Sequence, residues 1–207
     1  MKDVKIYQGA EARRTFRVTV IGTPKSGKSS LLYYFDKLEN PIARMAGYFE
    51  TARDEREISL QTASGVLKCV FIDNNIQDYS KATPEEWLKI CETDCLICMC
   101  ECLVPSVQNA VQLIKTFQKQ KNCLIFLAAN KSDDYDPDQI TIGVLDGYAS
   151  SVGAISIMCS IQQGLNMDHF QFLIADLLMN PRQKYQQVSQ GPAIKEAKAK
   201  GKGCSAM

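Results

Sequence analysis

The chain has 207 residues, of which 45% are hydrophobic and 23% charged, and its formal net charge is +1. This length and composition predict one globular domain with a sizeable core, plus an appendage. No stretch approaches the roughly 18 apolar residues of a membrane-spanning helix, and the first residues, MKDVKIYQ, lack the apolar run of a signal peptide. We therefore expect neither a membrane-spanning nor a disulfide-rich secreted protein, and interpret the nine cysteines as small buried thiols.

Basic residues gather at the end of the chain. Segment 181–207 holds six lysines and arginines against one acid, a net charge of +5, which leaves −4 on residues 1–180. An acidic body with a basic tail favours a tail that meets an anionic surface. Apolar residues also thin out after Pro181, so we expect a linker-like tail there and a flexible extension over residues 1–15.

Strands and helices alternate over residues 16–180, where we expect the folded domain. Several strands are continuously apolar, which is typical of an α/β fold with a parallel sheet covered by helices on both faces. We predict strands at 16–21, 55–62, 66–73, 95–101, 123–129 and 154–159. We predict helices at 27–38, from residue 83 onward, and at 106–119, 137–150 and 166–179.

The loop between the first strand and the first helix carries the strongest motif. Gly22–Ser29, with the sequence GTPKSGKS, fits G-x-x-x-x-G-K-[ST] at every fixed position. Backbone N–H groups of such a loop surround a phosphate at the positive end of the helix. Lys28 can reach the β- and γ-phosphate oxygens, and the Ser29 hydroxyl can bind Mg²⁺. The phosphate-binding candidates in this part of the chain are Gly22, Lys25, Ser26, Gly27, Lys28, Ser29 and Ser30.

Asp73 closes the third predicted strand. Ligands of a parallel α/β sheet bind at the carboxyl ends of its strands. An acid that ends the strand after a phosphate loop typically holds Mg²⁺, directly or through water. We therefore predict Asp73 as a metal-site residue; the alternative is an exposed acid at a strand end.

The fourth predicted strand is rich in cysteine, at positions 95, 98, 100 and 102. A metal site with thiolate ligands is one interpretation of this cluster. A regular strand does not easily wrap four ligands around one ion, however, and the sequence CLICMC is typical of a buried strand. We favour the buried strand.

The sequence Asn130-Lys131-Ser132-Asp133 follows the strong strand CLIFLAA. A carboxylate at this position can accept two hydrogen bonds from the N1–H and 2-amino edge of guanine. Adenine offers no matching donors, so the carboxylate would remain unpaired with the wrong purine. The motif predicts guanine recognition; the alternative is a polar turn.

With these motifs the chain resembles the Ras-like small GTPases over residues 16–180. The phosphate loop, a threonine in the next loop, the strand-end aspartate and the NKSD sequence all fall at nearly the separations found in that family. The resemblance implies a P-loop NTPase fold, the small G domain, with a six-stranded, mostly parallel sheet. It also implies a GTP-hydrolysing switch in signal transduction, cycling between GDP and GTP with slow or partner-assisted hydrolysis.

The family's functional residues map onto specific positions. The resemblance implies that Thr51 and Ser29 bind Mg²⁺ in the GTP state, that Thr51 also belongs to the phosphate-binding set, and that Tyr48 closes over the phosphates. It implies that Asn130, Lys131 and Asp133 hold the guanine. The base-capping S-A-K sequence of the family reads Met158-Cys159-Ser160 here, so the backbone N–H of Cys159 would contact the guanine O6.

The implied partners are regulatory proteins. Loops around 42–54 and 74–82 would change conformation between nucleotide states and meet effectors, exchange factors and GTPase-activating proteins. No nucleic-acid partner is expected.

Three departures from the family concern hydrolysis and base binding. The family sequence D-x-x-G-Q ends here in Ile76-Gln77, so the glutamine that would orient the attacking water is kept and the glycine is lost. Pro24 replaces a second loop glycine and has no N–H, and Arg44 stands where an aromatic would cover the base. These changes leave open a pseudo-GTPase, a scaffold with impaired hydrolysis or switching, in which Gln77 is a solvated loop residue. An ATP-using P-loop kinase is disfavoured by the NKSD sequence.

The last four residues, Cys204 to Met207, fit the C-a-a-X prenylation pattern. A single prenyl chain binds membranes only marginally, but four nearby lysines add attraction to an anionic leaflet. We therefore expect the protein to be anchored through Cys204 to the cytoplasmic face of a membrane, the plasma membrane above all. The alternative is an unmodified basic tail.

Overall fold

The computed structural model describes residues 15–37, 55–62, 65–74, 83, 85, 90–118, 123–134 and 136–180. The predicted N-terminal extension up to residue 14 and the tail from 181 lie outside these residues. In chain order the elements are β1 (Phe16–Gly22), α1 (Lys28–Lys37), β2 (Glu55–Thr62), β3 (Gly65–Asp73), β4 (Cys95–Glu101), α3 (Val104–Gln118), β5 (Leu124–Asn130), α4 (Ile142–Ser150), β6 (Ile155–Met158) and α5 (Met167–Met179).

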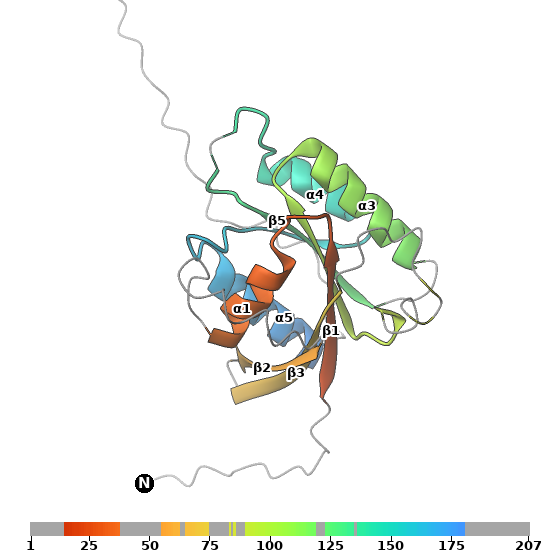
Figure 1. The fold of residues 1–207 in the computed structure, drawn as a ribbon, viewed down its shortest axis with the longest axis vertical. Coiled ribbons are helices and arrows are strands. Elements are labelled where there is room, and N and C mark those ends of the chain that lie inside the picture. The colour runs from red at the N-terminus through yellow and green to blue at the C-terminus, as the bar shows by residue number, and fades with distance from the viewer. Residues whose placement is uncertain are drawn as a thin grey trace, which may run out of the picture.

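The six strands form one sheet in the order β2-β3-β1-β4-β5-β6. Only the β2–β3 pair is antiparallel. Gly22 of β1 pairs with Met99 of β4, and Glu101 of β4 pairs with Asn130 of β5. The carboxyl ends of the central strands therefore meet at one edge of the sheet (Figure 1). The prediction of a six-stranded, mostly parallel sheet is confirmed.

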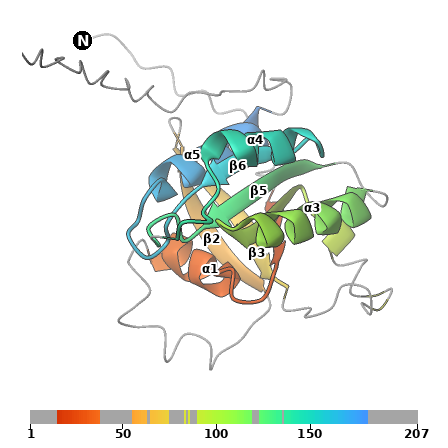
Figure 2. The same cartoon turned by 90° about the horizontal axis from the view of Figure 1, so that it is seen from above.

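Helices cover both faces of this sheet (Figure 2). α1 and α5 pack on one face, and α3 and α4 pack on the other. The side chains of β4 alternate between the two layers: Ile97 and Met99 enter the α1/α5 core, whereas Cys98 and Cys100 enter the α3/α4 core. Burial on both faces explains why this strand has no polar alternation in sequence.

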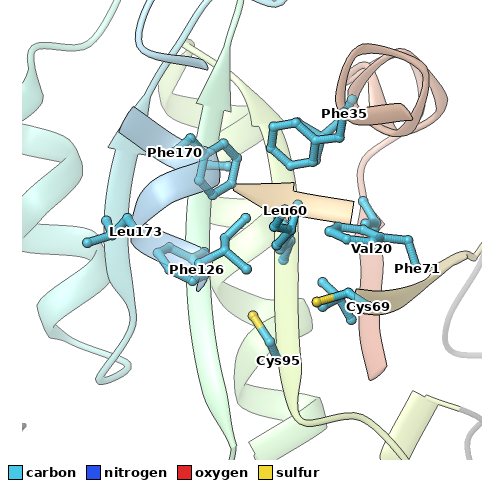
Figure 3. Close-up of a cluster of buried hydrophobic side chains, with 14 of the residues drawn as sticks. Val20, Phe35, Leu60, Cys69, Phe71, Cys95, Phe126, Phe170 and Leu173 are labelled. Carbon is cyan, nitrogen blue, oxygen red and sulfur yellow. The ribbon is translucent and has the colours of Figure 1, made fainter. Parts of the chain in front are cut away.

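Four phenylalanines join the elements of the α1/α5 core (Figure 3). The ring of Phe35 on α1 lies edge-to-face with Phe71 of β3 and with Phe170 of α5, at centroid distances of 5.9 and 5.8 Å. Phe170 also meets Phe126 of β5 at 5.5 Å. Such geometry is favourable beyond the burial of apolar area, and it holds α1 against β3 and α5.

The predicted helix bounds need two corrections. The fourth predicted helix begins at Ile142 rather than at residue 137, because residues 136–139 form a turn in which Gln139 N–H donates to the Asp136 carbonyl at 3.0 Å. Thr141 caps the helix instead, and its hydroxyl accepts from the Val144 N–H at 3.4 Å. α3 begins two residues earlier than predicted, with Pro105 in its first turn, where no N–H is needed.

The cysteines of β4 are divided between the two cores and do not converge on one point. Cys95 belongs to the α1/α5 core, whereas Cys98, Cys100 and Cys102 belong to the α3/α4 core. All eight cysteines of the described residues are free thiols. Among those residues no group of three or more potential ligands is placed to hold a metal ion. Within the same part of the chain, no helix combines the length and apolar character needed to cross a membrane.

Candidate nucleotide-binding site

The loop from Gly22 to Ser29 connects β1 to α1, and its shape depends on its two glycines. Gly22 has φ +148°, and a Cβ there would lie 2.1 Å from the Met99 carbonyl oxygen. Gly27 has φ +95°, and a Cβ there would lie 2.4 Å from Asn130 Nδ2. Any side chain at either position would therefore displace the neighbouring strand end or the loop. The motif glycines let the loop curl tightly at the edge of the sheet.

Lys28, in the first turn of α1, reaches back over the loop. Its Nζ donates to the carbonyl oxygens of Gly22 at 3.3 Å and Thr23 at 3.2 Å. Burial lowers the pKa of Lys28, and the nearby Asp73 carboxylate acts in the opposite direction. The ammonium group thus lies across the concave side of the loop, where a phosphate would be bound.

The other loop residues differ in exposure. Pro24 and Lys25 are exposed, and Lys25 adopts a left-handed conformation with φ +64°. Ser26 is fully buried, and its carbonyl accepts a hydrogen bond from the Asn130 side chain. Ser30 lies half-buried in the first turn of α1. The exposed side of the loop therefore lies at Pro24 and Lys25.

Ser29 and Asp73 lie in direct contact. The Ser29 hydroxyl donates to Asp73 Oδ2 at 2.6 Å, which joins the start of α1 to the end of β3. The second carboxylate oxygen, Oδ1, is buried and accepts no hydrogen bond within the described part of the chain. A buried, unpaired carboxylate oxygen is costly unless a cation or donor reaches it. A hydroxyl and a carboxylate are hard oxygen ligands, so this pair fits Mg²⁺.

Asn130, the last residue of β5, joins three segments of the site. Its Nδ2 donates to the Ser26 carbonyl at 3.0 Å, and its Oδ1 accepts from the Ile161 N–H at 3.1 Å. Its exposed fraction is only 5%. The phosphate loop, the end of β5 and the loop after β6 are thereby held together at the same edge of the sheet (Figure 1).

Lys131 and Asp133 follow Asn130 on the surface. Lys131 has φ +66°, and its backbone carbonyl accepts from Gln139 Nε2 at 3.2 Å. Its ammonium group donates to Glu101 Oε1 at the end of β4. Asp133 is exposed, and its carboxylate accepts no hydrogen bond from the described residues. Its acceptor oxygens are thus available to a ligand at the rim of the site.

The structure does not support the expected role of Cys159. Its backbone N–H donates to the Ala129 carbonyl at 2.9 Å, as a continuation of the β5–β6 pairing, and its side chain is buried in the α1/α5 core. An N–H already paired in this way does not face the base. The next N–H groups are also paired, Ser160 with the Leu165 carbonyl and Ile161 with Asn130.

Several predicted residues lie outside the described part of the chain. They are Tyr48, Thr51, Ile76, Gln77 and Cys204, together with Arg44. Their roles remain predictions from the sequence.

Sequence reasoning missed three residues that link the loops of the site. The Glu101 N–H donates to Ser106 Oγ at 2.9 Å, and the Ser106 and Thr23 hydroxyls are hydrogen-bonded at 3.2 Å. One signal was available: Glu101 is an acid at the carboxyl end of a buried strand, as Asp73 is.

The chain has detectable sequence similarity to a curated protein. No protein-family model matches the chain. Among curated proteins, it is similar to the Ras-like protein rasU of Dictyostelium discoideum, at 26% identity over 165 residues. The aligned segment covers 79% of this chain and 75% of that protein, so the similarity is not confined to the phosphate loop.

Proposed function

We propose that this chain, a divergent member of the Ras-like small GTPases, binds GDP and GTP with Mg²⁺ and acts as a membrane-anchored switch in signal transduction. One observation carries the proposal. Asn130, which begins the loop that would read guanine, donates to the Ser26 carbonyl of the phosphate loop at 3.0 Å and accepts from the Ile161 N–H after β6 at 3.1 Å. The loop proposed to hold the phosphates and the loop proposed to hold the base are therefore connected to each other by a buried hydrogen bond.

The phosphates would be held by the loop between β1 and α1. Gly22, Lys25, Ser26, Gly27 and Ser30 complete the proposed contact set in this loop, chiefly through backbone N–H groups. Lys28 would exchange its bonds to the loop carbonyls for bonds to phosphate oxygens, which a cation makes more strongly. Mg²⁺, when bound, neutralises charge on the β- and γ-phosphate oxygens.

The proposed metal ligands are Ser29, Asp73 and Thr51. The contact between Ser29 and Asp73 and the unpaired Asp73 Oδ1 support the first two. Thr51 enters only through the family resemblance.

The base would be read by Asp133, whose carboxylate accepts the N1–H and 2-amino hydrogens of guanine. Asn130 supports the site from beneath, and Lys131 flanks it. The N–H of Cys159 has no place in this arrangement, because it is paired with Ala129.

Hydrolysis would yield GDP and inorganic phosphate by attack of a water on the γ-phosphate. Gln77 is the proposed residue that orients this water. Ile76 replaces a glycine, and Pro24 removes an N–H from the loop. We therefore propose that intrinsic hydrolysis is slow, on the order of 10⁻⁴ per second, and that faster hydrolysis requires a GTPase-activating protein.

Anchoring would come from prenylation of Cys204 together with the basic tail. The net charge of +5 on residues 181–207 supports binding to the cytoplasmic face of an anionic membrane. Effectors and exchange factors would then meet the protein at that membrane.

A second candidate function is a pseudo-GTPase, a membrane-tethered scaffold that holds a nucleotide without hydrolysing it. The exposed Pro24 in the phosphate loop favours it, as does Ile76 in the sequence. The contact between Ser29 and Asp73 favours the working switch.

The decisive measurement identifies the nucleotide that copurifies with the protein and then follows single-turnover GTP hydrolysis. Bound GDP with measurable turnover supports the switch, and retained GTP without turnover supports the scaffold. Asp133→Ala, which removes the proposed guanine contact from an exposed position, should lose GDP affinity and keep its folded structure. No bound nucleotide, together with no Mg²⁺-dependent affinity for GTP, would contradict both proposals.

A further inference from the structure

Glu101 is a charged residue of the site that the proposed function leaves without a role. It is the last residue of β4 and pairs in register with Asn130, the last residue of β5. Its carboxylate forms an ion pair with Lys131 across these two strand ends. The exposed fractions of the two side chains are 29% for Glu101 and 38% for Lys131. The pair is therefore partly shielded from solvent.

The backbone of Glu101 is also fixed. Its N–H donates to Ser106 Oγ, in the first turn of α3, at 2.9 Å. The Ser106 hydroxyl is bonded in turn to Thr23 of the phosphate loop at 3.2 Å. A line of contacts thus runs from the phosphate loop through Ser106 and Glu101 to Lys131. It is separate from the bridge made by Asn130.

We propose that Glu101 is a positioning residue of the guanine site and acts by holding Lys131 in place before nucleotide binds. This inference rests on the proposed function. A lysine side chain samples many rotamers, and ordering it costs entropy that a preformed ion pair removes from the binding step. Lys131 lies in the chain between Asn130, which bonds to the phosphate loop, and Asp133, the proposed guanine contact.

The backbone around Lys131 supports this role. Its left-handed conformation, with φ +66°, is held by the bond from Gln139 Nε2 to its carbonyl oxygen. Both ends of the residue are therefore fixed by other elements. The sequence also has Ser160 where the family has a second lysine beside the base, so Lys131 is the lysine that the resemblance still places at the guanine.

The test is a double-mutant cycle in the full chain. Glu101→Gln keeps the shape of the side chain and removes its charge, and Lys131→Met keeps the stem and removes the ammonium. The measurement is the release rate of a fluorescent GDP analogue in the presence of Mg²⁺ and excess unlabelled GDP. We expect Glu101→Gln to speed release about five-fold at low salt. Glu57→Gln, at an exposed position of β2, should leave the rate unchanged.

Two readouts separate positioning from a general effect on the fold. In the Lys131→Met background, adding Glu101→Gln should leave release unchanged, because the residue through which Glu101 acts is gone. Raising the salt from about 0.05 to 0.5 M should bring the release rates of wild type and Glu101→Gln together, because a partly exposed ion pair is screened.

The outcomes distinguish this inference from the proposed function. If the wild-type chain binds GDP and Glu101→Gln releases it at the wild-type rate, the positioning role is wrong and the proposed function stands. The same holds if the Glu101→Gln effect persists in the Lys131→Met background. If the wild-type chain binds no GDP, both are wrong.

Discussion

At the scale of single residues, Asn130 has the most consequential contacts in the described site. It bonds to Ser26, which lies 104 positions earlier in the chain, and accepts a bond from Ile161, 31 positions later. Both bonds are buried. Its side chain therefore supports the structure of the site whether or not a ligand is present.

We predict that Asn130→Ala destabilises the protein without nucleotide. The change leaves the Ser26 carbonyl and the Ile161 N–H buried and unpaired, which should lower the free energy of unfolding by about 1–3 kcal/mol. Urea unfolding of the nucleotide-free protein measures this difference.

A matched control for that prediction is Asn109→Ala. Asn109 is exposed on α3, so its replacement should change the free energy of unfolding by less than about 0.5 kcal/mol. Equal stability of Asn130→Ala and wild type would show that the bridge contributes only through the ligand.

At the scale of elements, α4 is the helix whose sequence fits its structure least well. Its sequence, IGVLDGYAS, contains two glycines, and Cβ atoms built on them would meet nothing within 4 Å. Glycine in a helix interior costs conformational entropy and gains no packing in return. The apolar pattern alone therefore does not fix the start of this helix, which the turn at 136–139 and the Thr141 cap place five residues after the predicted one.

We predict that Gly147→Ala stabilises the protein by about 0.5–1 kcal/mol, because Gly147 is helical, exposed and surrounded by open space. Chemical denaturation measures the gain. Gly147→Pro at the same position should instead cost about 3 kcal/mol, since it removes a helix hydrogen bond. Opposite signs for the two variants are the expected result, and a loss of stability in Gly147→Ala would contradict the assignment of α4.

At the scale of the whole molecule, both cores contain buried thiols. Burial raises the pKa of Cys98, in the α3/α4 core, to about 12. It likewise raises the pKa of Cys159, in the α1/α5 core, to about 12. In the unfolded chain both thiols would ionise near pH 9. Ionisation of these two thiols therefore favours the unfolded chain, and one thiol lies in each layer.

We predict a loss of stability in alkaline solution. A pKa that is raised in the folded state gives stability that is complete below the unfolded value near 9 and is lost as the pH rises toward 12. Each fully buried thiol should account for about 1 kcal/mol of loss by pH 10. Urea unfolding between pH 7 and pH 10 measures the total.

Cys98→Ala isolates one thiol from the other groups that titrate in this range. The variant loses packing and should be less stable at pH 7, yet its stability should fall less steeply with pH than that of the wild type. Identical slopes for the two proteins would mean that Cys98 ionises as readily in the folded state as in the unfolded chain.

The sequence by itself determined the order and type of the elements, the parallel sheet and the glycine-bounded loop between β1 and α1 that is the candidate phosphate site. These features follow from local patterns: apolar runs of strand length, helical periodicity, and the fixed spacing of the glycines in the loop. Gly22 and Asp73 were recognisable because their roles depend on position relative to a strand end.

Only the tertiary structure decided which polar groups meet. In the folded chain, the Cys159 N–H donates to the Ala129 carbonyl, α4 begins at Ile142, and Glu101 forms an ion pair with Lys131. These contacts join residues from different strand ends and turns, and they depend on the register of neighbouring strands, which no local pattern encodes. The outcome for Glu101 is the clearest: its neighbour Lys131 lies 30 positions away in sequence and one strand away in the sheet.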